Sequence, residues 1–81
     1  MYEIFVETIG WIASILIVGA FAMNSFGKIA STSKLYQLAN LTGGIFFIVN
    51  TVYHKAYPSA VVNVVWVIIA VSALLKLKKT E

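Results

Sequence analysis

The sequence predicts an all-α membrane protein, a bundle of three transmembrane helices in one domain covering residues 1–81. Of the 81 residues, 60% are hydrophobic and 11% are charged, whereas soluble domains carry about 25% charged residues. Three stretches each come close to the roughly 20 apolar residues that cross a bilayer: Thr8–Gly27, Leu35–Tyr53 and Ala56–Leu75. A soluble bundle would show a polar face on its outer helices, and the sequence has no such face.

Composition also narrows the function classes. The chain has no cysteine, so we expect no disulfide and no thiolate metal site. The net charge of +3 comes from scattered lysines and a lysine-rich C-terminus, which does not indicate nucleic-acid binding in so apolar a chain. His54 is the one histidine, so we expect no metal site and no cofactor. No nucleophile–base pattern or phosphate-binding loop indicates an enzyme.

The first helix is expected over residues 5–26 and is rich in small residues, which let membrane helices approach closely. These residues are Gly10, Ala13, Ser14, Gly19, Ala20 and Ala22. Gly27 and Lys28 come directly after it. Glycine readily adopts the left-handed conformation that ends helices, and a lysine there faces the negative end of the helix dipole. We therefore expect this helix to end just before Gly27.

The second and third helices are expected over residues 34–53 and 58–76, joined by a short polar corner. Ser31 or Ser33 can cap the start of the second helix with its hydroxyl group. Pro58 suits the first turn of the third helix, because the N–H that proline lacks has no partner there in any case.

Gly43 and Gly44 lie in the middle of the second helix. Glycine in a helix interior costs about 1 kcal/mol relative to alanine in soluble proteins. In membrane helices, small residues more often mark the point where two backbones approach closely. We therefore expect the glycine pair at a close helix contact.

The lysines predict the orientation of the chain. With three spans, five of the six lysines fall on one side: Lys28, Lys34, Lys76, Lys78 and Lys79. The positive-inside rule makes that side cytoplasmic. We therefore expect the N-terminus outside and the C-terminus inside.

Amides and aromatic rings recur inside the apolar stretches. The second helix carries Gln37, Asn40, Gly44, Phe47, Thr51 and His54 on one stripe, with Asn50 beside it, and the third carries Ser59, Asn63, Trp66, Ala70 and Ala73. An unpaired amide costs several kcal/mol in hydrocarbon, so these residues pair with one another, face a cavity or bind a ligand. One interpretation is that amides bridge helices and aromatics fill space. The other is a polar-solute site lined by Asn40, Phe47, Asn50, Asn63 and Trp66.

The middle of the chain resembles the SemiSWEETs, the bacterial half-size relatives of SWEET sugar transporters in the PQ-loop/MtN3 group. The resemblance lies in Gly-Gly-Ile-Phe-Phe-Ile-Val-Asn at 43–50, a polar corner, Pro58 and then Asn63. By the spacing of that family, Gly43 matches its glycine, Phe47 its pocket tryptophan and Asn63 its pocket asparagine. The resemblance puts gate or hinge positions at Met23, Asn24, Tyr53 and Tyr57. Met23 and Asn24 replace the Pro-Gln element, so the family's proline hinge is missing.

The resemblance implies a parallel homodimer in a bacterial cytoplasmic membrane. A small neutral solute, such as a mono- or disaccharide, would bind between the protomers beside Phe47 and Asn63. Transport would be facilitative, because no acidic residue lies at the membrane midplane to couple a proton. The alternative is a non-transporting membrane protein that serves as a structural or accessory subunit of a complex.

The orientation is directly testable. A reporter that works only in the cytoplasm should be active when it is fused after Glu81, because most lysines lie on the same side of the membrane as the C-terminus. Fusing a cytoplasmic reporter and a periplasmic reporter at the same position provides the internal control. Activity of the periplasmic reporter alone would contradict the predicted topology.

Overall fold

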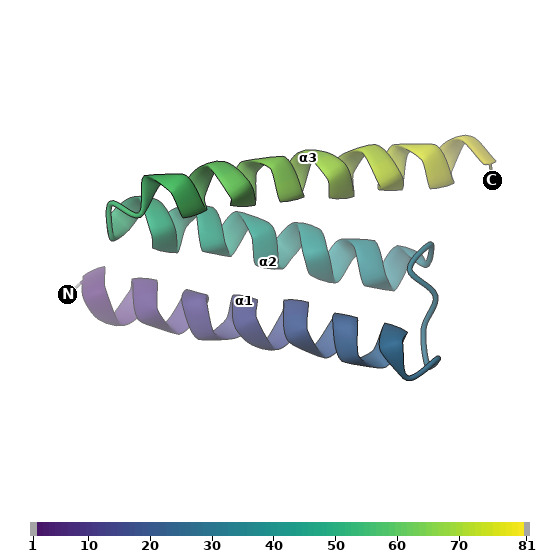
Figure 1. The fold of residues 1–81 in the computed structure, drawn as a ribbon, viewed down its shortest axis with the longest axis horizontal. Helices are drawn as coiled ribbons and strands as arrows, with labels where there is room; N and C mark the ends of the chain where they lie inside the picture. The colour runs from purple at the N-terminus through teal and green to yellow at the C-terminus, as the bar shows by residue number, and fades with distance from the viewer. Residues whose placement is uncertain (1, 81) are drawn as a thin grey trace.

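The computed structural model describes residues 2–80, with side chains up to Lys78, and over this range the chain folds into three helices (Figure 1). They are α1 (Tyr2–Ser25), α2 (Lys34–Tyr53) and α3 (Tyr57–Thr80). By length and composition, each is long and apolar enough to cross a membrane. At 1.5 Å per residue they extend about 30 to 36 Å, which matches the roughly 30 Å of hydrocarbon in a bilayer.

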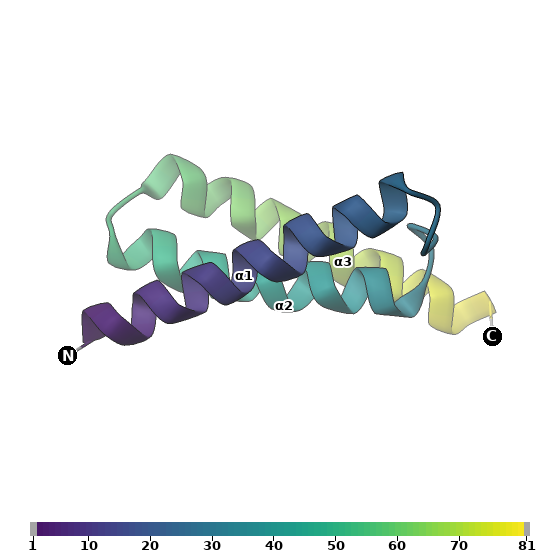
Figure 2. The same cartoon turned by 90° about the horizontal axis from the view of Figure 1, so that it is seen from below.

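Helix α2 lies between the other two helices. It contacts both α1 and α3, whereas α1 and α3 make no contact with each other within residues 2–80. Figures 1 and 2 show the resulting row, with α1 crossing α2 obliquely in the second view. The three helices therefore form an open layer and not a closed triangular bundle.

The two ends of this layer differ in charge. The start of α1 and the α2–α3 connection lie together (Figure 1), and we call this the corner end. The α1–α2 connection and the last turns of α3 lie at the opposite end, which we call the loop end. The corner end carries Glu3, Glu7 and Lys55, and the loop end carries Lys28, Lys34, Lys76 and Lys78. The side chain of Lys79 lies outside the described residues. The first connection and the end of α3 thus share one end, as the orientation argument requires.

Two helix boundaries differ from the sequence expectation. Helix α1 begins at Tyr2 and not near residue 5, and α3 continues to Thr80 past residue 76. Glu3 lies in the first turn of α1, at the positive end of the helix dipole. Lys76 and Lys78 lie in the last turns of α3, at its negative end. Each charge stabilises the helix end that carries it, so both helices extend beyond their apolar stretches.

A glycine ends α1 as expected. Gly27 has a φ of 75°, in the left-handed region. The N–H of Lys28 donates to the Met23 carbonyl at 2.8 Å, and the N–H of Gly27 donates to the Asn24 carbonyl at 3.1 Å. These two bonds form the Schellman motif, which satisfies carbonyls left without helical partners. The expectation for Gly27 is confirmed.

The starts of α2 and α3 also follow the sequence signals. The Ser33 hydroxyl accepts a hydrogen bond from the Tyr36 N–H at 3.1 Å, so Ser33 and not Ser31 caps α2. Pro58 is the second residue of α3, directly after Tyr57. Its missing N–H therefore leaves no helical bond unmade.

The corner between α2 and α3 repeats the Schellman motif with a lysine in place of glycine. The Ala56 N–H donates to the Thr51 carbonyl at 2.8 Å, and the Lys55 N–H donates to the Val52 carbonyl at 3.0 Å. Lys55 has a φ of 59°, which costs a residue with a Cβ roughly 1–2 kcal/mol. The two hydrogen bonds and the start of α3 hold this strained residue in place, and no signal in the sequence indicated it.

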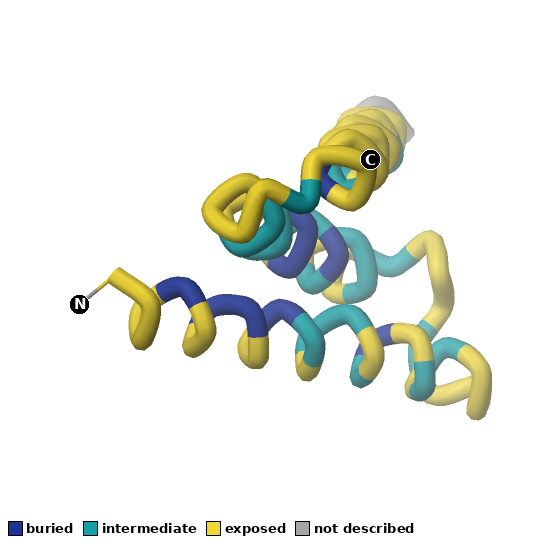
Figure 3. Tube along the Cα trace, turned by 60° about the vertical axis from the view of Figure 1, so that its left-hand side comes forward, coloured by how far each residue is buried: buried dark blue, intermediate teal, exposed yellow. Residues whose placement is uncertain are grey.

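Small side chains line the contacts between helices. Ala13 is 0% exposed, and Ala20, Ala60 and Ala70 are nearly as deeply buried. Figure 3 shows the buried positions gathered where α1 and α2 face each other. No large side chain is fully buried in the described part of the chain. The helices therefore associate through close backbone approach, which is how membrane helices pack, and not around a thick apolar core.

The glycine pair lies at these contacts, as expected. A Cβ added to Gly43 would lie 2.6 Å from Cγ1 of Ile17 on α1, and one added to Gly44 would lie 2.8 Å from Cγ2 of Val67 on α3. Consecutive residues of a helix point about 100° apart. Two adjacent glycines can therefore admit two neighbouring helices at the same level of α2, and the expectation of a close contact is confirmed.

Adding a single methyl group should test this packing. Gly43→Ala and Gly44→Ala should each destabilise the folded protein by about 1–3 kcal/mol through overpacking, even though alanine favours the helix. Gly19→Ala is the matched control, because no heavy atom lies within 4 Å of its added Cβ, and it should be neutral or slightly stabilising. Thermal unfolding in detergent measures all three. Equal melting temperatures would show that the glycines face lipid.

Candidate functional site

A groove between α1 and α2 lies near the corner end and has a volume of about 330 Å³. Its walls combine two aromatic rings with polar side chains: Glu7, Gly10, Trp11, Ser14, Phe47, Asn50 and His54. Ligand pockets usually measure about 300–1,000 Å³ and mix aromatic walls with a few polar groups. Most of these residues recur at spacings of three or four along their helix, which places them on one face of it.

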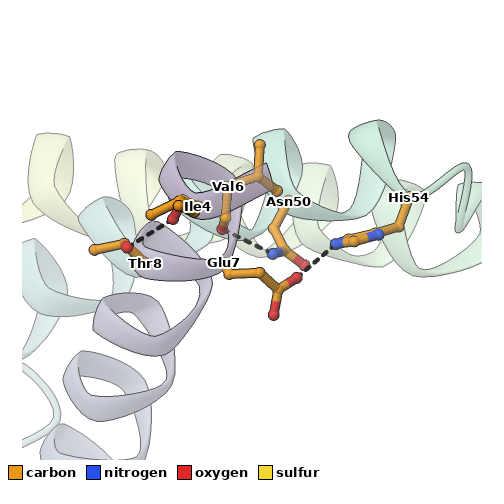
Figure 4. A network of polar contacts seen from close by, with 6 residues as sticks. All are labelled: Ile4, Val6, Glu7, Thr8, Asn50 and His54. Carbon is orange, nitrogen blue, oxygen red and sulfur yellow. Dashed lines mark hydrogen bonds and ion pairs between the residues drawn. The ribbon is translucent and has the colours of Figure 1, made fainter. Parts of the chain in front are cut away.

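Two polar contacts cross this groove (Figure 4). The Asn50 amide nitrogen donates to the Val6 carbonyl at 3.0 Å. His54 Nε2 lies 2.9 Å from a carboxylate oxygen of Glu7, with both side chains about half exposed. Exposed ion pairs contribute roughly 0–1 kcal/mol, so this pair orients the mouth of the groove more than it stabilises the fold. No cluster of three metal-ligating side chains occurs among the described residues.

Gly10 makes the Asn50 contact possible. A Cβ at Gly10 would lie 2.6 Å from the Asn50 amide nitrogen, so any larger residue would push this side chain away from the Val6 carbonyl. The small residues of α1 therefore shape the groove as well as the helix contact.

Asn50 retains unused hydrogen-bonding capacity. Its side-chain oxygen has no partner within residues 2–80. That oxygen is reachable from the surface of the chain, because no unpaired polar side-chain atom of the described residues is buried. A carbonyl oxygen can accept two hydrogen bonds. Asn50 can therefore accept from a ligand or from another helix placed over the groove.

Asn40 and Trp66 meet on the other side of α2. The Trp66 indole N–H donates to the Asn40 side-chain oxygen at 3.0 Å, and the Asn40 amide nitrogen donates to the Tyr36 carbonyl at 2.8 Å. Asn40 is only 5% exposed. Both ends of this amide are thus used inside the chain: the oxygen joins α2 to α3, and the nitrogen bonds within α2.

Asn63 also points toward α2. Its amide nitrogen donates to the Thr51 hydroxyl at 3.4 Å, a long hydrogen bond. The Thr51 hydroxyl in turn donates to the Phe47 carbonyl at 2.6 Å. Asn63 is partly buried, and within the protomer it bridges two helices.

The expected gate and hinge residues lie at opposite ends of the molecule. At the loop end, the Asn24 amide donates to the Ile29 carbonyl at 3.0 Å, which ties the α1–α2 connection to the end of α1. Met23 precedes Asn24, and the Met23 carbonyl accepts the hydrogen bond from the Lys28 N–H in the Schellman motif described above. At the corner end, the Tyr53 ring meets His54 edge-on, with centroids 5.4 Å apart. Tyr57 is exposed at the start of α3.

The structure therefore divides the predicted site residues into separate groups. Phe47 and Asn50 lie together in the α1–α2 groove. Asn40 and Trp66 lie together between α2 and α3, and Asn63 binds Thr51 nearer the corner end. The five residues thus do not form one continuous site within a protomer.

Sequence reasoning missed two residues that bound the groove, Glu7 and Trp11. Neither residue is among the site residues that the sequence predicts, although the sequence does carry a signal for Glu7. In the sequence, Glu7 lies three residues before Gly10 and seven before Ser14, so it extends the small-residue face of α1 by one turn. His54, the partner of Glu7, lies on the polar stripe of α2, but no pattern in the sequence indicates that this stripe faces the small-residue face of α1.

Comparison with known proteins gives a family and no activity. A family model matches residues 6–81, and the chain belongs to that family, whose function is uncharacterised. No curated protein and no solved structure matches the chain significantly.

The Asn40–Trp66 hydrogen bond predicts a measurable coupling. Trp66→Phe keeps an aromatic ring but removes the indole donor, and Asn40→Ala removes the acceptor. In membrane proteins such bonds contribute about 0.6 kcal/mol on average and rarely more than about 1.7. A double-mutant cycle on unfolding in detergent should give a coupling in this range. Purely additive effects of the two substitutions would show that the bond does not form.

Proposed function

We propose that this member of an uncharacterised family is a membrane carrier for a small neutral solute, working as a SemiSWEET-like homodimer by facilitative alternating access. One observation carries the proposal. Between two of its three membrane-length helices, the chain keeps a groove lined by aromatic rings, and an amide oxygen without a partner among the described residues lies beside them. In hydrocarbon, exposed polar groups of this kind are costly, so they are retained where they have a function.

The groove chemistry suits a sugar or a similar polyol. The faces of Trp11 and Phe47 offer apolar surface for the C–H face of a sugar ring. The free oxygen of Asn50 can accept from a hydroxyl group, and the Ser14 hydroxyl lies on the opposite wall, donating to the Gly10 carbonyl at 2.9 Å. The proposed site therefore rests on Phe47 and Asn50, which line the groove, more than on Asn40 and Trp66, whose polar groups bind within the chain, or on Asn63, which lies outside the groove and donates to Thr51.

The groove lies in the corner-end half of the protein. Its residues run from the corner end to Ser14 on α1 and to Phe47 on α2. Beyond them, Ile17 contacts the backbone at Gly43 and closes the space between the two helices. Under the proposal, transport requires a second conformation in which the solute leaves toward the loop end and the corner end of the groove closes.

A second copy of the chain would complete the site. Three helices in a row leave the α1–α2 groove open along one side, and a partner related by a two-fold axis would cover it. Closed two-fold dimers are the commonest oligomers. Two grooves facing each other across the axis would enclose one solute between the protomers.

A structural or accessory subunit is the second candidate function. The observation that favours it is the use of Asn40 and Asn63 to join α2 to α3, because amides engaged in this way stabilise the fold, and both ends of the Asn40 amide are used within the chain. Copurification of a defined partner complex in mild detergent, with no solute uptake, is the result this alternative expects.

Uptake by proteoliposomes tests the carrier proposal. The purified protein should raise the uptake of at least one labelled mono- or disaccharide above that of empty liposomes. Phe47→Leu removes the stacking ring and Asn50→Ala removes the amide, and each should lower uptake about five- to thirtyfold, because one lost polar or stacking contact amounts to roughly 1–2 kcal/mol.

Phe21→Leu is the matched control for Phe47→Leu, since Phe21 is an exposed aromatic residue of α1 outside the groove. Asn40→Ala is the control for Asn50→Ala, because both ends of the Asn40 amide are bonded within the chain, and it should lower the melting temperature slightly while uptake persists. Melting temperatures of all variants separate loss of binding from loss of fold. Absence of uptake for every small polar solute tried would refute the carrier proposal.

A further inference from the structure

A second groove lies between α2 and α3 at the loop end, far from the proposed solute site. Its volume is about 440 Å³, and its walls are mostly leucine side chains from both helices: Leu38, Leu41, Leu74 and Leu75. Two lysines, Lys34 and Lys78, lie at its mouth. An apolar groove headed by two cations matches the two chemical parts of a phospholipid.

The depth of the groove fits an acyl chain. Lys34 and Leu41 lie seven residues apart along α2, and Val71 and Lys78 lie seven residues apart along α3. At 1.5 Å per residue, each wall extends about 10 Å from the lysines into the apolar part of the helices. A lipid chain entering from the mouth would run along both leucine walls.

The charges at the mouth are uncompensated within the described part of the chain. Lys34 and Lys78 make no ion pair there, and the acidic residues of that part, Glu3 and Glu7, lie at the opposite end, while Glu81 lies outside the described residues. Lys34 is also the first residue of α2, so the positive end of that helix dipole faces the same region. The local field therefore favours an anion over a zwitterionic or neutral group.

A neighbouring groove adds a third cation. It has a volume of about 370 Å³, shares Leu77 with the first, and is lined by Lys76 together with Ser31, Thr32 and Gln37. Hydroxyl groups and an ammonium group in one place are suitable donors for phosphate oxygens. The loop end thus presents three lysines around two adjoining grooves.

We propose that the α2–α3 groove binds one anionic phospholipid, with its phosphate held by Lys34 and Lys78 and one acyl chain along the leucines. Lysines at a helix end reach the headgroup region while their stems cover apolar surface. Basic pockets between membrane helices are where anionic headgroups bind. The inference needs the chain to span a membrane, but it is independent of transport.

Lipid binding can be measured on the purified full chain in a neutral detergent. Native mass spectrometry and thermal unfolding should show binding of dioleoyl phosphatidylglycerol at concentrations where dioleoyl phosphatidylcholine does not bind. Lys34→Gln with Lys78→Gln should weaken phosphatidylglycerol binding about tenfold or more. Lys34→Arg with Lys78→Arg keeps the charges and should retain binding. Lys55→Gln, at the corner end, is the matched control and should also retain it.

Two further arms distinguish a lipid site from a simple phosphate site. Leu75→Trp adds bulk to the groove at an exposed position and should reduce lipid binding while leaving every lysine in place. Glycerophosphoglycerol, the soluble headgroup without acyl chains, should not bind. Equal binding of the two lipids, retention of binding in the double glutamine variant, or equally tight binding of the soluble headgroup would each overturn the proposal.

Discussion

The close approach of two helices to α2 at one level is the contact on which the rest of the structure depends. Gly43 removes the side chain that would meet Ile17 of α1, and Gly44 removes the one that would meet Val67 of α3. In a bilayer no hydrophobic force draws helices together, so dispersion contacts from such close packing supply most of the attraction. Because the glycines are adjacent and point in different directions, α2 becomes the central helix, with α1 and α3 on separate sides.

This arrangement gives the two sides of α2 different roles. On the α3 side, Asn40 and Asn63 bond to Trp66 and Thr51 across the helix contact, so polar groups are used in the fold. On the α1 side, Asn50 is only partly satisfied and lies in an open groove beside Phe47. The Asn40 amide thus uses both of its ends in the fold, whereas the Asn50 amide keeps an oxygen without a partner in the described part of the chain. The two ends differ as well, since the lysine-rich loop end has an apolar groove suited to lipid.

The sequence predicts the elements of this fold better than their arrangement. Helix ends are set by local chemistry, and Gly27, Ser33 and Pro58 act where their residue types indicate. The close helix contact at the glycine pair could also be predicted, because glycine in the middle of a helix has few other uses. The order of the helices could not be predicted, because every helix is apolar on all sides and no face indicates which helix packs against it. The grouping of the site residues depends on that order. For this reason the sequence does not predict that Phe47 and Asn50 lie apart from Asn63, or that Glu7 pairs with His54.

A disulfide between α1 and α2 provides the most direct measurement of this arrangement. A Cβ at position 10 would lie 3.8 Å from the Asn50 Cβ, close to the mean for disulfides of about 3.8 Å, and the chain has no cysteine of its own. Oxidation in membranes should link Gly10→Cys to Asn50→Cys within one chain. It should not link Gly10→Cys to Val61→Cys on α3, because α1 and α3 make no contact within residues 2–80. An intramolecular link in the second variant and none in the first would show that α1 packs on α3, and would contradict the central position of α2.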